Sequence, residues 1–298
     1  MTFKGLIIGG DRKKEKKYAT FKGEVNDMTV ITKITVGKKN KSRYNIFIDQ
    51  GKGEEFGFSV SEDVLIKMDL KKGMTIDPLD AMEIAYQEDI QRAFTSALNY
   101  LSYRMRSEAE IKTHLKEKEF EEHIIKEALH KLAQLKYIND EEFANAFVQT
   151  RINAGDKGPI VVAQELRQKG IQSNHAESAL QLYTKELQLQ HVEKLIGKLL
   201  KNNNKLSIVE LKRKIEQTLL RKGFSSYIIE EVFQNIEFSQ DDDQEWESIC
   251  KHGDKAHRRL SKYSGYEYEQ RMKSALYRKG FAMELIERYL EEIQQMGE

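Results

Sequence analysis

LLRKGF (residues 219–224) occurs in four versions along the chain, and the other three are LKEKEF (115–120), LRQKGI (166–171) and LYRKGF (276–281). The copies follow one another at intervals of roughly 50 residues, a period that is typical of stacked supersecondary units. A single unit of this kind cannot bury its apolar face alone, so neighbouring units must pack together. The sequence therefore predicts a tandem array of about four repeats.

Each copy of this signature predicts the end of a helix. A lysine lies in the last turn, where positive charge interacts favourably with the helix dipole; the four are Lys118, Lys169, Lys222 and Lys279. Three copies then have a glycine where helices often adopt a left-handed backbone, at Gly170, Gly223 and Gly280. The first copy has Glu119 instead, and a non-glycine residue in this conformation costs about 1 kcal/mol. We therefore expect the first of these helices to end differently.

The flanking segments complete a repeat of three helices. Before the signature, S-x-x-E capping boxes begin at Ser107, Ser207 and Ser264, while Gly158 and Pro159 begin the corresponding helix of the second copy. After the signature, apolar residues recur with the 3.6-residue period of an amphipathic helix. A further helix precedes each of these starts, at roughly 80–103, 139–154, 185–201 and 243–260. Four such repeats contain about twelve helices.

A strand-like alternation of side chains precedes the array. Apolar and polar residues alternate over 30–36, 44–48 and 56–60, which predicts three short strands of an antiparallel β-meander. A short helix is expected around Val64–Met68. Because about 50 residues form a domain too small to be very stable alone, we expect the meander to pack against the first helical repeat. The predicted fold is mainly α, with tandem three-helix repeats in an elongated, curved array after this small β-meander.

These patterns divide the chain into six parts. They are an N-terminal extension (1–27), the β-meander domain (28–79) and four three-helix repeats (80–137, 138–186, 187–238 and 239–298). The extension fits neither pattern, and two explanations of it stay open. It is either a disordered segment or an upstream stretch that precedes a natural start at Met28.

Composition excludes several classes of protein. The chain has 298 residues and a net charge of +1, which argues against indiscriminate nucleic-acid binding but leaves room for one basic face. Cys250 is the single cysteine, so no internal disulfide can form, as expected for the reducing cytoplasm. No apolar run approaches the roughly 18 residues of a membrane span.

Motifs for catalysis are missing from the sequence. There is no P-loop, dinucleotide-binding fingerprint, nucleophile elbow or H-E-x-x-H zinc motif. His123 and His130 fall on one face of a helix, but no third metal ligand accompanies them. We therefore expect a binding protein rather than an enzyme, with neither a metal nor a cofactor.

One longer stretch resembles a known family. YINDEEFANAFVQTR (137–151), followed by KGPIVVAQELRQKGI (157–171), resembles the RecX family, regulators of the bacterial recombinase RecA. LSYRMRSEAEIKTHL (101–115) is similar to an arginine-rich segment of the family, and ITKITVGKKNKSRYNIFID (31–49) is similar to the β segment of its long form. The resemblance covers roughly residues 28–298.

Much of this hallmark also has a structural explanation. Asn139 and Glu142 suit a capping box, and Ile138 and Phe143 suit its hydrophobic staple. The residues to which we assign structural roles are Tyr137, Ile138, Asn139, Asp140, Glu142, Phe143, Ala144, Gly158, Gly170, Gly223 and Gly280.

The resemblance implies regulation by binding. A RecX protein binds RecA and its single-stranded-DNA filament, and it mostly inhibits ATP hydrolysis and strand exchange during DNA repair, homologous recombination and the SOS response. It implies a cytoplasmic monomer with no membrane partner. Two other interpretations stay open: a helical-repeat protein that binds single- or double-stranded DNA independently of RecA, and a general helical-repeat scaffold.

Basic side chains off the apolar stripes are the candidate contacts with RecA or DNA. Cations on a solvated face need no partner, whereas on a contact surface they would meet phosphates or acidic groups. The candidates are Arg104, Arg106, Lys112, Arg151, Lys157, Arg167, Lys169, Lys212, Arg213, Arg221, Lys222, Arg258, Arg278 and Lys279.

Overall fold

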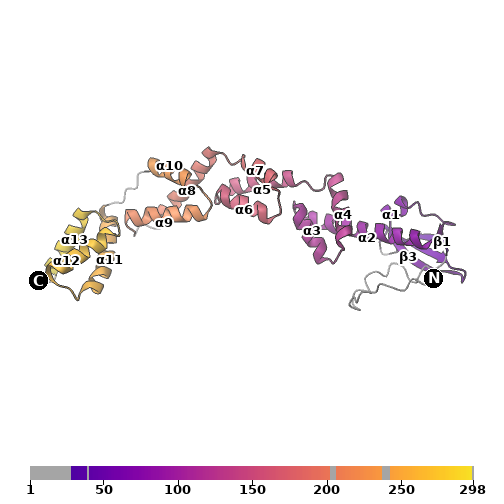
Figure 1. The fold of residues 1–298 in the computed structure, drawn as a ribbon, viewed down its shortest axis with the longest axis horizontal. Helices are drawn as coiled ribbons and strands as arrows, with labels where there is room; N and C mark the ends of the chain where they lie inside the picture. Colours follow the sequence, from indigo (N-terminus) through magenta and orange to yellow (C-terminus); the bar gives the residue numbers. More distant parts are fainter. Residues whose placement is uncertain (1–27, 39, 202–205, 237–241, 297–298) are drawn as a thin grey trace, which may run out of the picture. The chain divides into compact units, whose positions relative to one another are not determined.

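The computed structural model describes residues 28–38, 40–201, 206–236 and 242–296, and the N-terminal extension expected from the sequence lies outside them. The chain divides after Asn139 into two compact units, a first and a second. The described residues form thirteen helices and four strands, labelled in Figure 1. The prediction of a mainly α fold, with three-helix repeats after an antiparallel sheet, is confirmed. The division into six parts stays a prediction.

The first unit begins with a small antiparallel sheet. Its strands β1 (Thr29–Val36), β2 (Arg43–Asp49), β3 (Glu54–Ser61) and β4 (Thr75–Ile76) lie in the order β3-β2-β1-β4. The three longer strands agree with the predicted meander, and β4 was not predicted because two residues show no alternation. The short helix α1 (Glu62–Lys67) follows β3, as expected.

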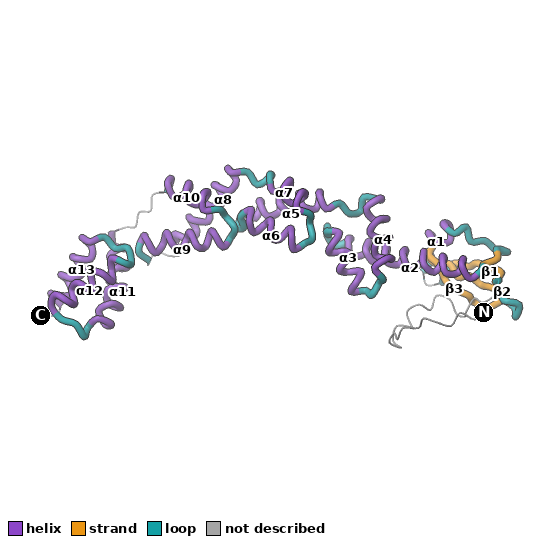
Figure 2. Tube along the Cα trace, in the orientation of Figure 1, coloured by secondary structure: helices purple, strands orange, loops and turns teal. Residues whose placement is uncertain are grey.

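A long helix, α2 (Pro78–Leu101), belongs to two cores at once (Figure 2). Near its start, Ala81 and Ile84 pack into the core of the sheet. Further along, Ala93, Phe94 and Ala97 pack into the core of the first three-helix repeat. The prediction that the meander packs against the first helical repeat is therefore confirmed, and one continuous helix makes the connection.

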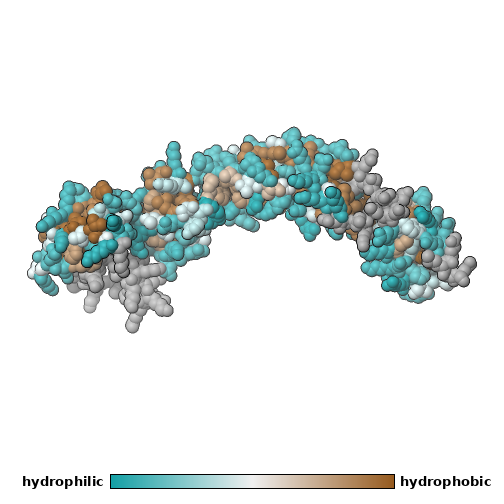
Figure 3. Space-filling view, turned by 180° about the vertical axis from the view of Figure 1, so that it is seen from behind, coloured by the Kyte–Doolittle hydropathy of each residue, from teal (hydrophilic) through white to brown (hydrophobic). Residues whose placement is uncertain are grey.

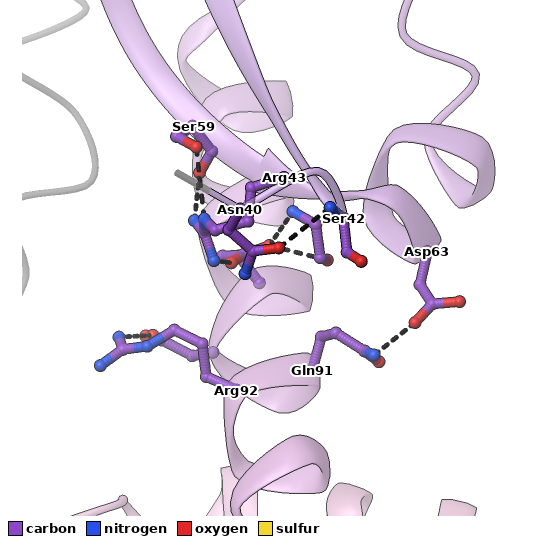
Figure 4. A network of polar contacts seen from close by, with 10 residues as sticks. Asn40, Ser42, Arg43, Ser59, Asp63, Gln91 and Arg92 are labelled. Carbon is purple, nitrogen blue, oxygen red and sulfur yellow. Dashed lines mark hydrogen bonds and ion pairs between the residues drawn. The ribbon is translucent and has the colours of Figure 1, made fainter. Parts of the chain in front are cut away.

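A buried carboxylate of α2 forms an ion pair and hydrogen bonds with residues of the sheet. Glu88 is 1% exposed, and it accepts hydrogen bonds from Arg43 Nη1 (2.7 Å) and from the amide (2.8 Å) and hydroxyl (3.0 Å) of Ser61. Arg43 also donates to the carbonyl oxygen of Ser59 at 2.8 Å, and Figure 4 shows the two side by side. Burial of a charge is tolerated here because ion pairing and hydrogen bonds replace its hydration.

The four repeats each contain three helices. Repeat 1 has α2, α3 (Glu108–Glu117) and α4 (Glu122–Gln134), and repeat 2 has α5 (Asp140–Ala154), α6 (Pro159–Gln168) and α7 (Ser173–Leu180). Repeat 3 has α8 (Lys185–Lys201), α9 (Ile208–Arg221) and α10 (Ser226–Asn235), and repeat 4 has α11 (Asp242–Leu260), α12 (Gly265–Tyr277) and α13 (Met283–Met296). Repeats 2 and 3 share one hydrophobic core, whereas repeat 4 has its own.

The end of α3 corrects one expectation. Glu119 has a positive φ of 61°, so this helix ends in the same left-handed turn as the copies with glycine, and the expected difference is wrong. The amide of Phe120 donates to the carbonyl of Leu115 at 3.2 Å, just as the amide of Phe224 donates to the carbonyl of Leu219. Closing this turn brings Phe120 onto the core of repeat 1, which offsets the strain.

Of the three predicted capping boxes, one forms in full, one forms only its serine half and one is absent. Ser107 forms the complete box, and the Ser207 hydroxyl accepts from the amide of Glu210 at 3.3 Å. At Ser264 the prediction is wrong, since its side chain makes no capping hydrogen bond. Gly265 follows with a φ of +58°, so the chain enters α12 by a different path.

Candidate functional site at the repeat junctions

The second unit joins its repeats end to end through their middle helices. Between repeats 2 and 3, the amide of Gly158 donates to the carbonyl of Lys222 (2.7 Å), and the amide of Ile160 donates to the carbonyl of Gly223 (3.1 Å). The end of α9 therefore meets the start of α6 (Figure 1). The first amides of one helix and the last carbonyls of another normally lack partners, and here each set satisfies the other.

The junction of repeats 3 and 4 uses side chains for the same purpose. The Ser207 hydroxyl at the start of α9 donates to the carbonyl of Lys279 at the end of α12, at 2.5 Å. Lys279 Nζ lies 2.6 Å from Glu210 Oε1, and His252 Nε2 lies 3.3 Å from Glu210 Oε2. Burial lowers the pKa of His252, and nearby lysines add to this effect, while Glu210 opposes it.

Close packing at these junctions gives the signature glycines a second role. A Cβ atom on Gly223 would lie 2.5 Å from the main-chain nitrogen of Val161, and one on Gly280 would lie 2.3 Å from Val209 Cβ. Both contacts are closer than a real Cβ allows. The sequence identified these residues only as helix caps. The one sequence sign of docking was Gly158, which stands where other copies have serine and whose Cβ would lie 2.3 Å from the Gly223 carbonyl oxygen.

Many of the predicted contact cations already have partners within the chain. The pairs are Arg104–Glu110 (2.9 Å), Lys112–Glu122 (2.6 Å), Arg151–Glu165 (2.8 Å), Lys157–Glu165 and Lys279–Glu210. Lys222 donates to the carbonyl of Asp156 at 3.1 Å, Arg106 lies over the ring of Tyr100 at 4.0 Å, and Lys169 lies near Phe143 and Phe147.

These internal pairs are also visible in the pKa values. Hydrogen bonds from Lys112 and Lys116 lower the pKa of Glu122 to about 2. The hydrogen bond to Glu110 raises the pKa of Arg104. These cations are therefore engaged with acidic groups inside repeat 1, which reduces what they can offer to a partner.

Other predicted cations point into solvent. Arg167, Lys212, Arg213, Arg221, Arg258 and Arg278 are all exposed. Arg221 bonds to its own helix, where its Nε donates to the carbonyl of Gln217 at 3.3 Å. Among the described residues, no carboxylate pairs with Arg213 or Arg278.

Three arginines meet at one cavity, which we call the arginine pocket. Arg213 of α9, Arg259 of α11 and Arg278, the C-cap residue of α12, line a cavity of about 290 Å³ at the junction of repeats 3 and 4. The remaining lining residues are Val209, Glu210, Ala275 and Lys279. Sequence reasoning selected Arg213, Arg278 and Lys279 but missed Arg259. The sequence indicated Arg259 only as a member of the basic cluster at 255–262. Two adjacent arginines on a helix cannot be told apart without knowing what each one faces.

The first unit has a polar cleft of a different character. Its volume is about 760 Å³, and its walls come from α2, the sheet and the end of α3. Figure 4 shows Gln91 reaching toward Asp63 across this cleft, and Arg92 pairs with Asp89 at 2.8 Å. Arg43 is likewise paired with Glu88. Most charged side chains that line the cleft therefore already have a partner within the chain.

The face drawn in Figure 3 is mostly hydrophilic, with smaller apolar areas between. Among the described helices, none is both long and apolar enough to span a membrane. The part of the chain that the structure describes contains no group of three or more histidine, cysteine or acidic side chains that could hold a metal ion.

Comparison with known proteins finds family models that match most of the described chain. Four family models match it: "Regulatory protein RecX N-terminal domain" at 29–77, and the first, second and third three-helix domains of RecX at 93–132, at 139–180, and at both 186–233 and 242–290. The third model thus matches twice, over repeats 3 and 4.

Individual relatives agree with these models. "Regulatory protein RecX" of Bacillus cytotoxicus is 43% identical over 264 residues, which cover 89% of this chain and 98% of the relative. The protein of the same name from Halalkalibacterium halodurans is also 43% identical, over 88% and 99% of the two chains. A solved structure described as "Crystal structure of regulatory protein RecX" matches with a TM-score of 0.64 and 36% identity, over 69% of this chain and 99% of that one.

Proposed function

Because the chain belongs to the RecX family of regulatory proteins, we propose that it binds the RecA recombinase assembled on single-stranded DNA and modulates its activity, mostly by inhibition. The observation that carries this proposal is the extent of the match, since family models cover the sheet and all four repeats. The affected activities are DNA-dependent ATP hydrolysis and strand exchange, in DNA repair and recombination.

The repeat architecture supports a mechanism based on several weak contacts. Direct hydrogen bonds join α6 to α9 and α9 to α12, so cations of successive repeats are held at defined intervals. RecA is itself a repeating filament, and tandem contacts along it would gain strength through effective concentration. Bridging of adjacent RecA subunits would hinder access of a second DNA and favour loss of subunits.

The protein acts by binding in this proposal, and its partners are RecA and the DNA on which RecA assembles. The chain is a monomer that needs neither cofactor nor metal, and the single cysteine, Cys250, suits a cytoplasmic location. The contact residues are the cations named from the sequence, and the exposed ones, such as Arg167 and Arg213, are the stronger candidates.

RecA's ATP hydrolysis on single-stranded DNA tests the proposal directly. The full-length chain is titrated into the reaction from far below the RecA concentration. We expect inhibition at substoichiometric amounts, because one chain affects several filament subunits. Inhibition only at amounts that saturate the DNA would instead indicate competition for DNA, and no effect would favour a scaffold with other partners.

Removal of repeat 4 tests the contribution of tandem contacts. A chain that ends before Asp242 loses α11, α12 and α13, which have a core of their own, whereas a cut before repeat 3 would open the core shared with repeat 2. We expect the shortened chain to lose far more than a quarter of its affinity for the filament, because avidity is multiplicative rather than additive. Unchanged inhibition would contradict bridging but leave binding to RecA intact.

A further inference from the structure

The arginine pocket concentrates positive charge that the fold does not need. Arg213, Arg259 and Arg278 come from α9, from α11 and from the C-cap of α12, and all three are exposed. Like charges that share one cavity repel each other, and the repulsion is only partly screened at this range. Water and salt reduce this repulsion because the arginines are exposed, and an anion bound in the cavity would relieve what remains.

Among the described residues, the lining of the pocket contains a single acidic side chain. Glu210 is the one acid in the lining, and its two carboxylate oxygens already face Lys279 (2.6 Å) and His252 (3.3 Å). Several other basic side chains of the described second unit have carboxylate partners, for instance Arg271 with Glu267 (2.9 Å) and Lys185 with Glu231 (2.8 Å). The three pocket arginines have none in that part of the chain.

The kind of anion follows from the donors. A guanidinium group presents a planar fork of N–H donors that matches phosphate and carboxylate oxygens. A carboxylate accepts in a single plane, whereas a phosphate group is tetrahedral and accepts from several directions at once. Donors that line one cavity from three sides of a junction therefore suit phosphate better. We propose that Arg213, Arg259 and Arg278 form a phosphate-binding site at the junction of repeats 3 and 4.

The junction itself builds this site. Arg213 lies on one side of the contact, and Arg259 and Arg278 lie on the other. The hydrogen bond from Ser207 to Lys279 holds the two sides together, and Arg278 Nε donates to the carbonyl of Ser274 at 3.2 Å, which helps to orient its side chain. A phosphate bound between them would tie repeat 3 to repeat 4, so ligand binding would stabilise the docked arrangement.

The phosphate has two chemical sources, the backbone of a nucleic acid or a free small phosphate. Both present the same oxygens to the arginines, and the experiment below separates them. The proposal does not depend on the proposed regulation of RecA, because every measurement is made without RecA.

The test uses the full-length chain and two phosphate probes. Fluorescence anisotropy with an oligothymidine of about 20 nucleotides measures binding at several salt concentrations. Thermal unfolding with and without inorganic pyrophosphate measures the small phosphate. The variants are Arg213→Gln, Arg259→Gln and Arg278→Gln, each checked for its helix content by circular dichroism.

Lys255→Gln is the matched control. Lys255 is exposed on the same helix as Arg259, α11, carries the same charge and lies outside the pocket lining. We expect each pocket variant to weaken oligonucleotide binding roughly tenfold, as expected for loss of a charged hydrogen bond, and to reduce the salt slope by about 0.7. The control should change affinity less than about twofold, because the lost charge acts only through screened solvent. Arg259→Lys, which keeps the charge but loses the fork, should fall between them.

Each outcome decides the proposal. If the pocket variants weaken binding of the oligonucleotide, the ligand is the backbone of a nucleic acid. If they abolish only the thermal stabilisation by pyrophosphate, the ligand is a small phosphate. The proposal is overturned if Lys255→Gln has the same effect as Arg259→Gln, or if neither probe distinguishes the pocket variants from wild type. Equally effective competition by poly-glutamate would also overturn it, because the pocket would then recognise carboxylates. Failure here leaves inhibition of RecA by the wild-type chain untouched, so the two proposals fail separately.

Discussion

The Ser207 hydroxyl lies 2.5 Å from the carbonyl oxygen of Lys279, 72 residues further along the chain. The same hydroxyl accepts a hydrogen bond from the amide of Glu210 at 3.3 Å, which caps the start of α9. The Ser207 side chain therefore caps the start of α9 in repeat 3 and also bonds to repeat 4. Local capping and repeat docking share a single atom.

Replacement of Ser207 by alanine should remove both functions. We expect a loss of about 2 kcal/mol in the free energy of unfolding, about 1 from the helix cap and the rest from the partly buried hydrogen bond to the carbonyl of Lys279. Chemical denaturation followed by circular dichroism measures the loss.

Ser225 provides the matched control, because it caps α10 through the amide of Ile228 (3.4 Å) and no bond from its hydroxyl to another repeat is present in the described structure. Ser225→Ala should cost about 1 kcal/mol. Equal losses for the two variants would show that the bond to Lys279 adds nothing.

Alanine at Gly280 should undock repeat 4. Its φ of +88° strains any other residue, and the new Cβ would lie 2.3 Å from Val209 Cβ. We expect the free energy of unfolding to fall by roughly 2–4 kcal/mol. Hydrogen exchange should then be faster at the amides of repeat 4. Gly265 has a similar φ of +58° but open space around it, so Gly265→Ala should cost only about 1 kcal/mol. Similar costs at both glycines would contradict the steric part of this argument.

Loss of the Glu88 carboxylate should loosen the sheet from α2. Glu88→Ala leaves the amide of Ser61 and the guanidinium of Arg43 without their shared acceptor, although Arg43 is about a third exposed and regains some water. We expect a loss of about 2–3 kcal/mol in thermal or urea unfolding. Asp89→Ala, which removes only the more exposed pair with Arg92, should cost less than about 1 kcal/mol. A larger effect at Asp89 than at Glu88 would refute the role assigned to the buried group.

Glycine at position 119 should stabilise the first repeat. Glu119 adopts a φ of 61°, which glycine adopts without strain. We expect a gain of roughly 0.5–1 kcal/mol, since the relief of strain is partly offset by the greater freedom of glycine in the unfolded chain. Glu117→Gly, in the last turn of α3, should instead lose roughly 0.5 kcal/mol. A destabilised Glu119→Gly would mean that the glutamate side chain itself holds the turn.

Stability of the second unit should fall in mild acid. Burial lowers the pKa of His191 and of His252 below the ordinary 6.5, and nearby lysines add to both shifts. The unfolded chain therefore binds more protons than the folded chain once the pH drops below about 6.5. Stability contributed by the neutral imidazoles is complete above that pH and is lost as the pH falls toward the folded-state pKa values.

Melting temperatures between about pH 7.5 and 5.5 measure this effect. The double variant His191→Gln, His252→Gln should show a flatter dependence than wild type over that range. A wild-type melting temperature that rises on acidification would mean that the contact of His252 with Glu210 outweighs burial.

The sequence by itself determined the secondary structure and the repeat. Signatures ending at Phe224 and Phe281, capping serines such as Ser107 and alternation in the strands are local patterns, and helices and strands follow from interactions over a few residues. Those patterns located the starts and ends of nearly all the helices to within a few residues. They failed at Glu119 and Ser264, where packing of Phe120 and the backbone of Gly265 prevailed over local preference.

Only the tertiary structure decided which residues meet. The bond between Ser207 and Lys279 and the contact of Gly223 with Val161 join residues more than 60 positions apart, beyond the reach of any local pattern. The same holds for charge, because the sequence shows how many cations there are but not which have partners. Arg151 has Glu165, whereas Arg259 faces a cavity with two other arginines. The free energy of a charged side chain depends on its neighbours in space, and those are fixed only when the repeats dock.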